Sequence, residues 1–242
     1  MISASQLSLL SVQIAVWLPN SAAFTQSRFL GSVLGNYSER YDGDPQIMPF
    51  GPEVPDDVPR IILQSKDERW KIQAGTTRID SSRTRNIHDM LDDKDTGEKA
   101  FVYQECVDVL SEYLQDTGNH VTRVGIITSR FLQVENAAQI LVDRFSSEEA
   151  KSSLFVDSQS FEIHNHRLYK LPLTDYDING WVRCKSGILE PLKIPVLVVE
   201  QDINTPVEAN PVHFNGTQLA EFVGTAFREM TSTLDLYFPE EI

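Results

Sequence analysis

The alternation of hydrophobic and polar positions first predicts a strand and then a helix. Residues 9–18 alternate around Val12, Ile14 and Val16, the period of two expected of a half-buried strand, with Trp17 on the other face. Residues 24–37 carry apolar positions at helical spacing, and Asn20 is placed to cap a helix. The following stretch, residues 41–59, is rich in Gly, Pro and Asp and predicts a loop.

A hairpin and a long helix complete the first part of the chain. The pattern predicts strands over residues 60–64 and 70–79, joined by a polar turn, followed by an exposed polar loop over residues 81–95. A helix with a capping-box start at Asp95 and Glu98 then keeps apolar side chains at helical spacing. Gly118 predicts the end of that helix.

The order of elements then repeats. After a strand come a short helix capped by Asn136, a polar connector, three strands and a final helix whose capping pair is Asn215 and Gln218. Their expected ranges are 121–134, 137–145, 146–160, 161–171, 178–188, 194–203 and 217–236.

The repeated order predicts an α+β protein of two similar halves. The N-terminal half, residues 1–119, reads β-α-β-β-α, and the C-terminal half, residues 120–242, reads β-α-β-β-β-α. We expect the halves to pack closely as one unit. Their antiparallel sheets would be joined edge to edge or packed together, with the helices on the outer face.

The acidity of the chain narrows the classes of partner. The 242 residues carry a formal net charge of -14, with 23% charged and 41% hydrophobic residues. Such an excess repels the phosphates of nucleic acids, so nucleic-acid binding is disfavoured unless a local basic patch overrides it. A basic protein partner, a cationic ligand and plain solubility all suit an acidic surface.

The cysteines and the N-terminus indicate a cytoplasmic protein. Cys106 and Cys184 lie far apart in apolar segments, which predicts two buried thiols and neither a disulfide framework nor a zinc site. The first basic residue is Arg28, so the basic start of a secretory signal is missing. No apolar run is long enough to span a bilayer, and we expect no membrane contact.

One cluster of basic residues stands out in the acidic chain. It could bind an anionic partner or ligand, or pair internally with carboxylates such as those of residues 89–98. Its six members are Lys66, Arg69, Lys71, Arg78, Arg83 and Arg85.

Other candidate chemistry is sparse. His164 and His166 point to the same face of a predicted strand and could share a metal ion, but no further ligand is apparent, and a solvated strand edge is the alternative. The acidic stretch 92–98 fails the EF-hand pattern, because Gly97 falls where a ligand is needed. Phosphate-loop, dinucleotide and serine-nucleophile motifs are missing. The sequence therefore predicts no catalytic, cofactor-binding or metal-binding residue, and no cofactor.

Several short segments resemble a sporadically distributed family of bacterial proteins of roughly this length. The resemblance is carried, in order, by residues 11–19, 51–60, 61–79, 121–132 and 195–205 and by the final helix. The family pattern has an aromatic and Arg-rich third strand, whereas residues 76–83 here lack the aromatics. The resemblance implies no catalytic residues, and the family's patchy occurrence implies a defence or toxin–antitoxin setting.

Two functions remain open at this point. The first is a non-enzymatic subunit that binds a protein partner, which the acidity and the missing catalytic motifs favour. The alternative is a small-ligand-binding protein or an enzyme with a cleft between the two halves. A deep pocket of convergent polar groups with shifted pKa values would favour the alternative, and a flat or filled junction would favour the binding subunit.

Overall fold

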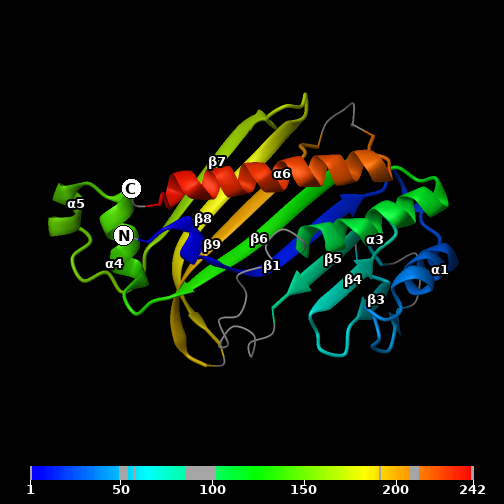
Figure 1. Cartoon of the computed structure of the whole chain (residues 1–242), viewed down its shortest axis with the longest axis horizontal. Helices are drawn as coiled ribbons and strands as arrows, with labels where there is room; N and C mark the ends of the chain where they lie inside the picture. Colours follow the sequence, from blue (N-terminus) through cyan, green and yellow to red (C-terminus); the bar gives the residue numbers. More distant parts are fainter. Residues whose placement is uncertain are drawn as a thin grey trace.

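The protein is an α+β fold, described by a computed structural model (Figure 1). The structure describes residues 2–48, 54–56, 58–85, 102–190, 192–207 and 213–240. The elements of the first half, in chain order, are η1 (Ala4–Gln6), β1 (Ser8–Trp17), η2 (Ser21–Ala23), α1 (Gln26–Tyr37), β2 (Gln46–Ile47), β3 (Ile61–Gln64), β4 (Trp70–Ala74), β5 (Arg78–Thr84) and α3 (Val102–Thr117).

The second half repeats the series of a strand, a helix, three strands and a long helix, but it has the short helix α5 where the first half has the short strand β2. Its members are β6 (Arg123–Gln133), α4 (Ala137–Phe145), α5 (Glu148–Ser153), β7 (Glu162–Lys170), β8 (Asp177–Leu189), β9 (Ile194–Asn204) and α6 (Gly216–Tyr237). The described strands form one antiparallel sheet in the order β2-β3-β4-β5-β1-β6-β9-β8-β7. In each half the first strand pairs with the last strand of the half, so the strand order is shared. That the halves are duplicates stays a prediction.

The two halves are joined edge to edge through their first strands. β1 and β6 pair antiparallel along almost their whole lengths, from Ser8 opposite Phe131 to Trp17 opposite Arg123, with one irregularity between Leu9 and Ser11. Of the two arrangements that the sequence left open, the joined sheet is therefore the one observed. The junction is itself part of the sheet.

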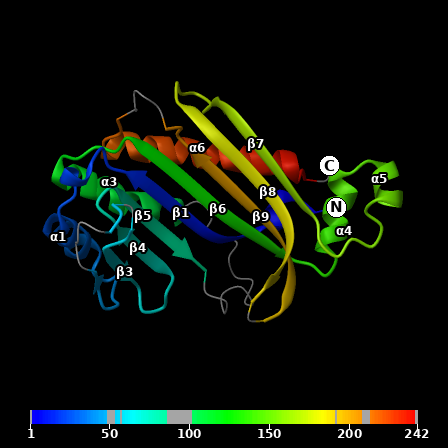
Figure 2. The same ribbon diagram turned by 180° about the vertical axis from the view of Figure 1, so that it is seen from behind.

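The long helices lie on one face of this sheet (Figures 1 and 2). α3 packs on β1 and β5, and α4 packs on β8 and β9. α6 runs along the same side and contacts both α3 and the central strands. We call the opposite side, which no described helix covers, the polar face.

Hydrophobic residues between sheet and helices form two clusters. The larger contains Val12, Ile14 and Ile126 of the central strands with side chains of α1, α3 and α6. The smaller lies under α4 and the end of α6. α6 spans both, since Met230 belongs to the larger cluster and Leu234 to the smaller. α6 therefore packs against both hydrophobic clusters.

The expected start of α6 and the expected end of α3 are observed, whereas Asn136 precedes α4 without a side-chain capping hydrogen bond. Asn215 and Gln218 form the expected capping box of α6, with Gln218 N–H donating to Asn215 Oδ1 at 2.9 Å. Gly118 follows α3 with a φ of +66°, a conformation that glycine adopts without steric cost. Asn20 caps the short helix η2, and α1 begins only at Gln26.

The expected hairpin is confirmed by the antiparallel pair β3 and β4, but the expected extent of its second strand, to residue 79, was wrong. Residues 70–79 form two strands, β4 and β5, with a turn between them, and β5 continues to Thr84 through residues expected to be a loop. These residues read as a loop because they are polar. Inside a sheet, however, one side of β5 can face solvent while Ser81 is buried on the other.

The connector 146–160 differs from its prediction, and the predicted start of the helix before Gly118 cannot be compared with the structure. Within the connector 146–160, Ser147 caps a short helix, α5, by accepting from Ala150 N–H. The expected helix start at Asp95 and the acidic stretch 92–98 lie outside the described residues. Among the described residues, every helix is too short or too polar to cross a membrane.

The packing of α6 allows a direct test of the core. Phe222 is 1% exposed and contacts the rings of Tyr176 and Phe214. Phe222→Ala should lower the free energy of unfolding by about 3–5 kcal/mol, because it removes buried surface and leaves a cavity. Urea unfolding measures this. Leu236→Ala, on the same helix but 80% exposed, is the control and should change stability by no more than about 0.5 kcal/mol.

Candidate functional site

A connected row of polar and aromatic side chains crosses the middle of the polar face. Directly paired residues of neighbouring strands share a face, so the strand register identifies its members. They come from six strands, and we call them the polar ladder. The members are Gln73 of β4, Arg78 and Asp80 of β5, Gln13 and Trp17 of β1, Arg123 of β6, Asp202 and Asn204 of β9, and Asn179 of β8.

Asp80 is the hub of the first part of the ladder. Its carboxylate is 5% exposed and accepts hydrogen bonds from the side-chain amides of Gln13 at 2.9 Å and Gln73 at 3.4 Å. Arg78 donates to it twice, from Nε at 3.1 Å and Nη2 at 2.8 Å. Such a carboxylate fixes the surrounding side chains, because each of them would lose a charged partner by moving.

Trp17 lies at the centre of the ladder, at the junction of the two halves. Arg78 and Arg123 are its direct neighbours on the two flanking strands. Their guanidinium carbons lie 4.9 and 4.4 Å from the indole ring, within the range of cation–π attraction. One aromatic ring is therefore held between two cations, one from each half.

Arg123 connects the ladder to the second half. It donates to the Thr205 carbonyl at 3.1 Å and to Asn204 Oδ1 at 3.3 Å. Asn204 in turn accepts from Asn179 at 3.1 Å and donates to Asp202 at 2.9 Å. Burial lowers the pKa of Arg123, and the charge of Asp202 raises it again. The second part of the ladder is thus also fixed by its own hydrogen bonds.

A second aromatic group lies farther along the same face. The ring of His166 stacks on Trp181, with centroids 4.0 Å apart and planes inclined by 9°. Arg183 lies 5.4 Å from the same indole ring. His164 contacts the Glu162 carboxylate at 2.6 Å, and this contact lowers the pKa of Glu162.

The two histidines share a face, as the sequence predicted. The ring of His166 already stacks on the indole of Trp181, and His164 already contacts the carboxylate of Glu162. Nowhere in the described parts of the chain do three or more His, Cys, Asp or Glu side chains come close enough to hold a metal ion.

The basic cluster of the sequence does not form one patch. Lys71 and Arg78 lie on the polar face, whereas Arg83 lies on the helix side, with its guanidinium carbon 5.3 Å from the ring of Trp70. Lys66 and Arg69 belong to the β3–β4 turn. Arg85 follows the end of β5, where its N–H donates to the Leu10 carbonyl. The cluster was expected from sequence proximity, but alternation along β4 and β5 separates its members.

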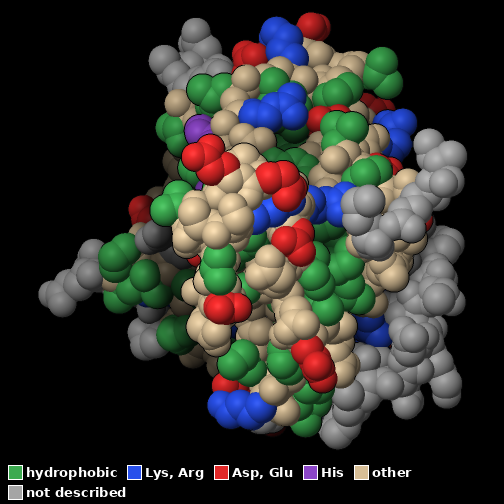
Figure 3. Space-filling model, turned by 90° about the vertical axis from the view of Figure 1, so that its left-hand side faces the viewer, with side chains coloured by type: hydrophobic (Ala, Val, Ile, Leu, Met, Phe, Trp, Pro, Cys, Tyr) green, Lys and Arg blue, Asp and Glu red, His purple; other side chains and the backbone are tan. Residues whose placement is uncertain are grey.

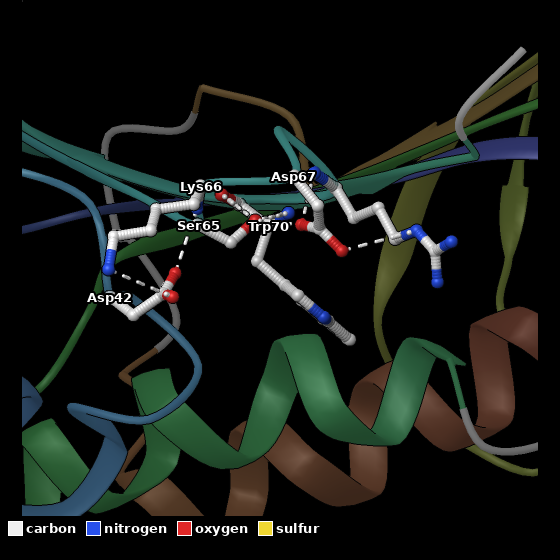
Figure 4. A network of polar contacts seen from close by, with 6 residues as sticks. Asp42, Ser65, Lys66, Asp67 and Trp70 are labelled. Atoms are coloured by element: carbon white, nitrogen blue, oxygen red, sulfur yellow. Dashed lines mark hydrogen bonds and ion pairs between the residues drawn. The ribbon is translucent and has the colours of Figure 1, made fainter.

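The β3–β4 turn borders a polar hollow of about 570 Å³ beside the end of α1. Figure 4 shows Asp42 below Lys66, with Ser65 and Asp67 in the turn and Trp70 pointing toward α3. Asp42 accepts from the Lys66 N–H at 2.8 Å, and its other oxygen lies 3.7 Å from Lys66 Nζ. Lys66 is therefore paired with Asp42, and Arg69 is paired with Asp67 of the same turn at 3.3 Å.

Arg40 and Tyr37 form the inner wall of the hollow. Arg40 lies over the rings of Tyr37 and Trp70, at 4.9 and 4.7 Å, and donates to the Glu105 carbonyl. Tyr37 donates to Glu112 at 2.5 Å. Burial and this carboxylate raise the pKa of Tyr37, so its hydroxyl stays neutral and is a poor proton donor to a ligand.

A more apolar groove of about 720 Å³ lies at the end of the molecule formed by the N-terminus, α4 and the end of α6. Ile2, Ile140 and Phe145 contribute apolar side chains, and Asp143 and Arg144 contribute charges. Figure 3 views the molecule from this end, where hydrophobic, acidic and basic side chains are interspersed.

Under the helices, three polar side chains lie on the central strands. Thr128 and Arg130 of β6 and Gln201 of β9 are at most 4% exposed. Gln201 donates to the Met230 carbonyl of α6, but within the described residues Thr128 Oγ1 and Arg130 Nε have no hydrogen-bond partner. Burial lowers the pKa of Arg130, against the opposing charge of Asp235.

Sequence reasoning missed the polar ladder almost entirely. A signal was present: Trp17 lies out of phase with the apolar residues of its strand, on the face that alternation assigns to solvent. A large aromatic residue on a polar face marks an unusual surface. Its partners Arg123 and Asn204 could not be found, because they come from strands more than one hundred residues farther along the chain.

Neither of two comparisons with known protein sequences finds a relative. A scan against protein-family models finds no match to this chain, and a search of curated proteins finds none either. The resemblance of its short segments to a bacterial family therefore stays a prediction.

The stability of the fold should depend on the negative charge of Asp80, the hub of the polar ladder. Asp80→Asn should lower the free energy of unfolding by about 2–3 kcal/mol, because Arg78 and two amides lose a buried anionic acceptor. Asp202→Asn is the matched control, since Asp202 is half-buried and accepts one side-chain hydrogen bond in the ladder. It should cost less than about 1 kcal/mol. Equal losses in urea unfolding would show that Asp80 is not the hub.

The cysteines, both buried as expected, predict a pH dependence of stability. Burial raises the pKa of Cys106 and of Cys184 to about 12, from an ordinary value of 9.0. The unfolded thiols ionise first, so their contribution is complete below pH 9 and is lost as the pH rises toward 12. Between pH 8 and 10, a Cys106→Ala, Cys184→Ala variant should therefore lose about 3 kcal/mol less stability than the wild type, about half of it from each thiol. Identical losses would mean that the native thiols ionise normally.

Proposed function

We propose that this chain is a non-enzymatic protein-interaction subunit that binds its partner through the polar face. The observation that carries the proposal is Trp17, held between Arg78 and Arg123 on a sheet face that no described helix covers. Tryptophan and arginine dominate the few residues that carry most of the energy of protein interfaces. Because these side chains are already held by their neighbours, binding a partner would cost little side-chain conformational entropy.

The charge of the polar face also supports a protein partner. Its strands carry six basic side chains, Lys71, Arg78, Arg123, Lys170, Arg183 and Lys185, and five acidic ones, Asp80, Glu162, Asp177, Glu200 and Asp202. The face therefore has a net charge of +1, which leaves -15 for the rest of the chain. A partner of ordinary charge meets little repulsion here, unlike over the acidic remainder.

The partner that fits is a protein surface of low net charge rather than a nucleic acid. The polar face offers Arg78, Arg123 and Arg183 to carboxylates, and Asp202 and Glu200 to hydrogen-bond donors. Two indoles, Trp17 and Trp181, offer flat apolar area between these groups. A phosphate backbone would meet nearly as many anions as cations on this face.

The alternative, a ligand-binding protein or enzyme, has weaker support. It predicted a cleft between the two halves, but that junction is filled by the paired strands β1 and β6. The hollows described above take no lining residue from either strand. The polar hollow beside Trp70 favours this alternative most, yet its Lys66 is already paired with Asp42 and its Asp67 with Arg69.

The family resemblance supports a setting for this activity. If the chain belongs with the sporadically distributed bacterial proteins, its partner would be encoded nearby, as in defence or toxin–antitoxin systems. A cytoplasmic location and a protein partner are parts of the same proposal.

Co-expression with the products of neighbouring genes tests the proposal. The wild type should co-elute with one of them, and Trp17→Ala with Arg123→Ala should weaken that complex by at least about a hundredfold, the loss expected of two central contacts. Circular dichroism should show the fold intact.

A matched control separates the polar face from the polar hollow. Lys66→Ala with Asp42→Ala removes the ion pair at the hollow and should leave the complex unchanged. Loss of binding in this control, with normal binding by the Trp17 and Arg123 variant, would move the partner site to the hollow. A wild type that binds none of these proteins at micromolar concentration would refute the proposal.

A further inference from the structure

The strand β7 is a long edge strand without a neighbour on its outer side. It is the last strand in the sheet order and pairs only with β8, over nine residues in register. Seven of these residues are exposed and two half-exposed. Both ribbon views show no described element beyond it (Figures 1 and 2). Such an edge presents a row of backbone donors and acceptors to another chain.

The backbone of β7 shows which residues face outward. Just before the strand, Ser186 N–H donates to the Phe161 carbonyl, and just after it, Leu171 N–H donates to the Tyr176 carbonyl. Hydrogen-bonded pairs of an antiparallel ladder alternate with non-bonded pairs. The odd-numbered residues of β7 therefore bond to β8. The even-numbered residues, from Glu162 to Lys170, direct their N–H and C=O groups away from the sheet.

Within the described residues, the strand at the opposite edge of the sheet is much shorter. That strand, β2, consists of Gln46 and Ile47 alone. Both edges expose apolar side chains, Ile47 of β2 at 51% and, at β7, Leu168 at 70% and Leu173 in the following turn at 94%, so it is the length of β7 that sets it apart. A second chain would therefore add to the sheet at β7.

We propose that the occupant of this edge is β7 of a second copy of the chain, paired antiparallel about a twofold axis at His166. In this register residue 162 lies opposite residue 170 of the other copy, so Glu162 meets Lys170 at both ends of the interface. Ile163 meets Tyr169 on the helix side, and every outward N–H and C=O group gains a partner.

Charge complementarity selects the second copy and its register. The strand is acidic at its start and basic at its end, which is the pattern that an antiparallel copy of itself complements. Shifting the axis to Arg167 would place two guanidinium groups opposite each other, and shifting it to Asn165 would leave Lys170 without a residue opposite. With the axis at His166, all nine residues of β7 lie opposite a residue of the other copy, and no two arginines face each other.

The pairing would also extend the polar face. A twofold axis perpendicular to the sheet keeps the even-numbered side chains of both copies on the same side. The Trp181–His166 stacks would then lie next to each other at the axis, and the two polar ladders would flank them. The dimer does not depend on the proposed function, and either can fail without the other.

Two single charge reversals and their mixture test the proposal by sedimentation equilibrium. The wild type should dimerise with a micromolar Kd. Glu162→Lys alone would place lysines opposite each other at both ends, and Lys170→Glu alone would do the same with carboxylates. Each should raise the Kd by at least roughly tenfold. An equimolar mixture should recover a heterodimer of near wild-type affinity, because both end pairs are then opposite in charge.

His166→Pro gives an independent test of the backbone. The N–H of residue 166 faces outward, so its loss spares the pairing with β8 but blocks the new strand. This variant should remain monomeric with an unchanged circular dichroism spectrum. Lys193→Glu, which changes the net charge as Lys170→Glu does but lies outside β7, should dimerise like the wild type. A wild type that stays monomeric above micromolar concentration, or a mixture that fails to recover dimers, would overturn the proposal.

Discussion

The antiparallel pairing of β1 with β6 is the constraint on which the rest of the structure depends. It makes one sheet of two halves and places the first strand of each half at the centre. Both strands then need one apolar side, which Val12, Ile14 and Ile126 supply, and the helices must cover that side. Since all covering helices lie together, the other side is left to polar and aromatic residues.

The polar ladder follows from the same pairing. Trp17 ends β1 and Arg123 begins β6, so only an antiparallel register brings them together. Arg78 reaches the other side of the indole because β5 also runs antiparallel to β1. The buried carboxylate of Asp80 then holds Arg78 in place. A surface fixed by buried charges differs from an ordinary solvated face, whose side chains move independently.

The two halves share a strand order but end differently. The first half closes with the short strand β2, and the helix α1 packs beside α3 on its helix side. The second half ends in β7, whose nine residues keep one row of backbone groups unpaired within the described chain. An exposed edge of this length is commonly blunted by charges, and here the charges are opposite at its two ends. The difference leaves a nine-residue strand at one edge of the described sheet and a two-residue strand at the other.

The sequence by itself determined the fold class, the α-helices other than α5, and most strands, because period and capping are local. The Asn215–Gln218 box and the Gly118 terminus stand where the pattern predicts them. It misread the polar strand β5, since a strand with one solvated side looks like a loop until its neighbours are known. The six clustered cations were likewise separated by alternation across two faces. Only the tertiary structure decided that Trp17, Arg123 and Asn204 meet, because contacts between distant strands depend on sheet order and register, and neither leaves a local trace.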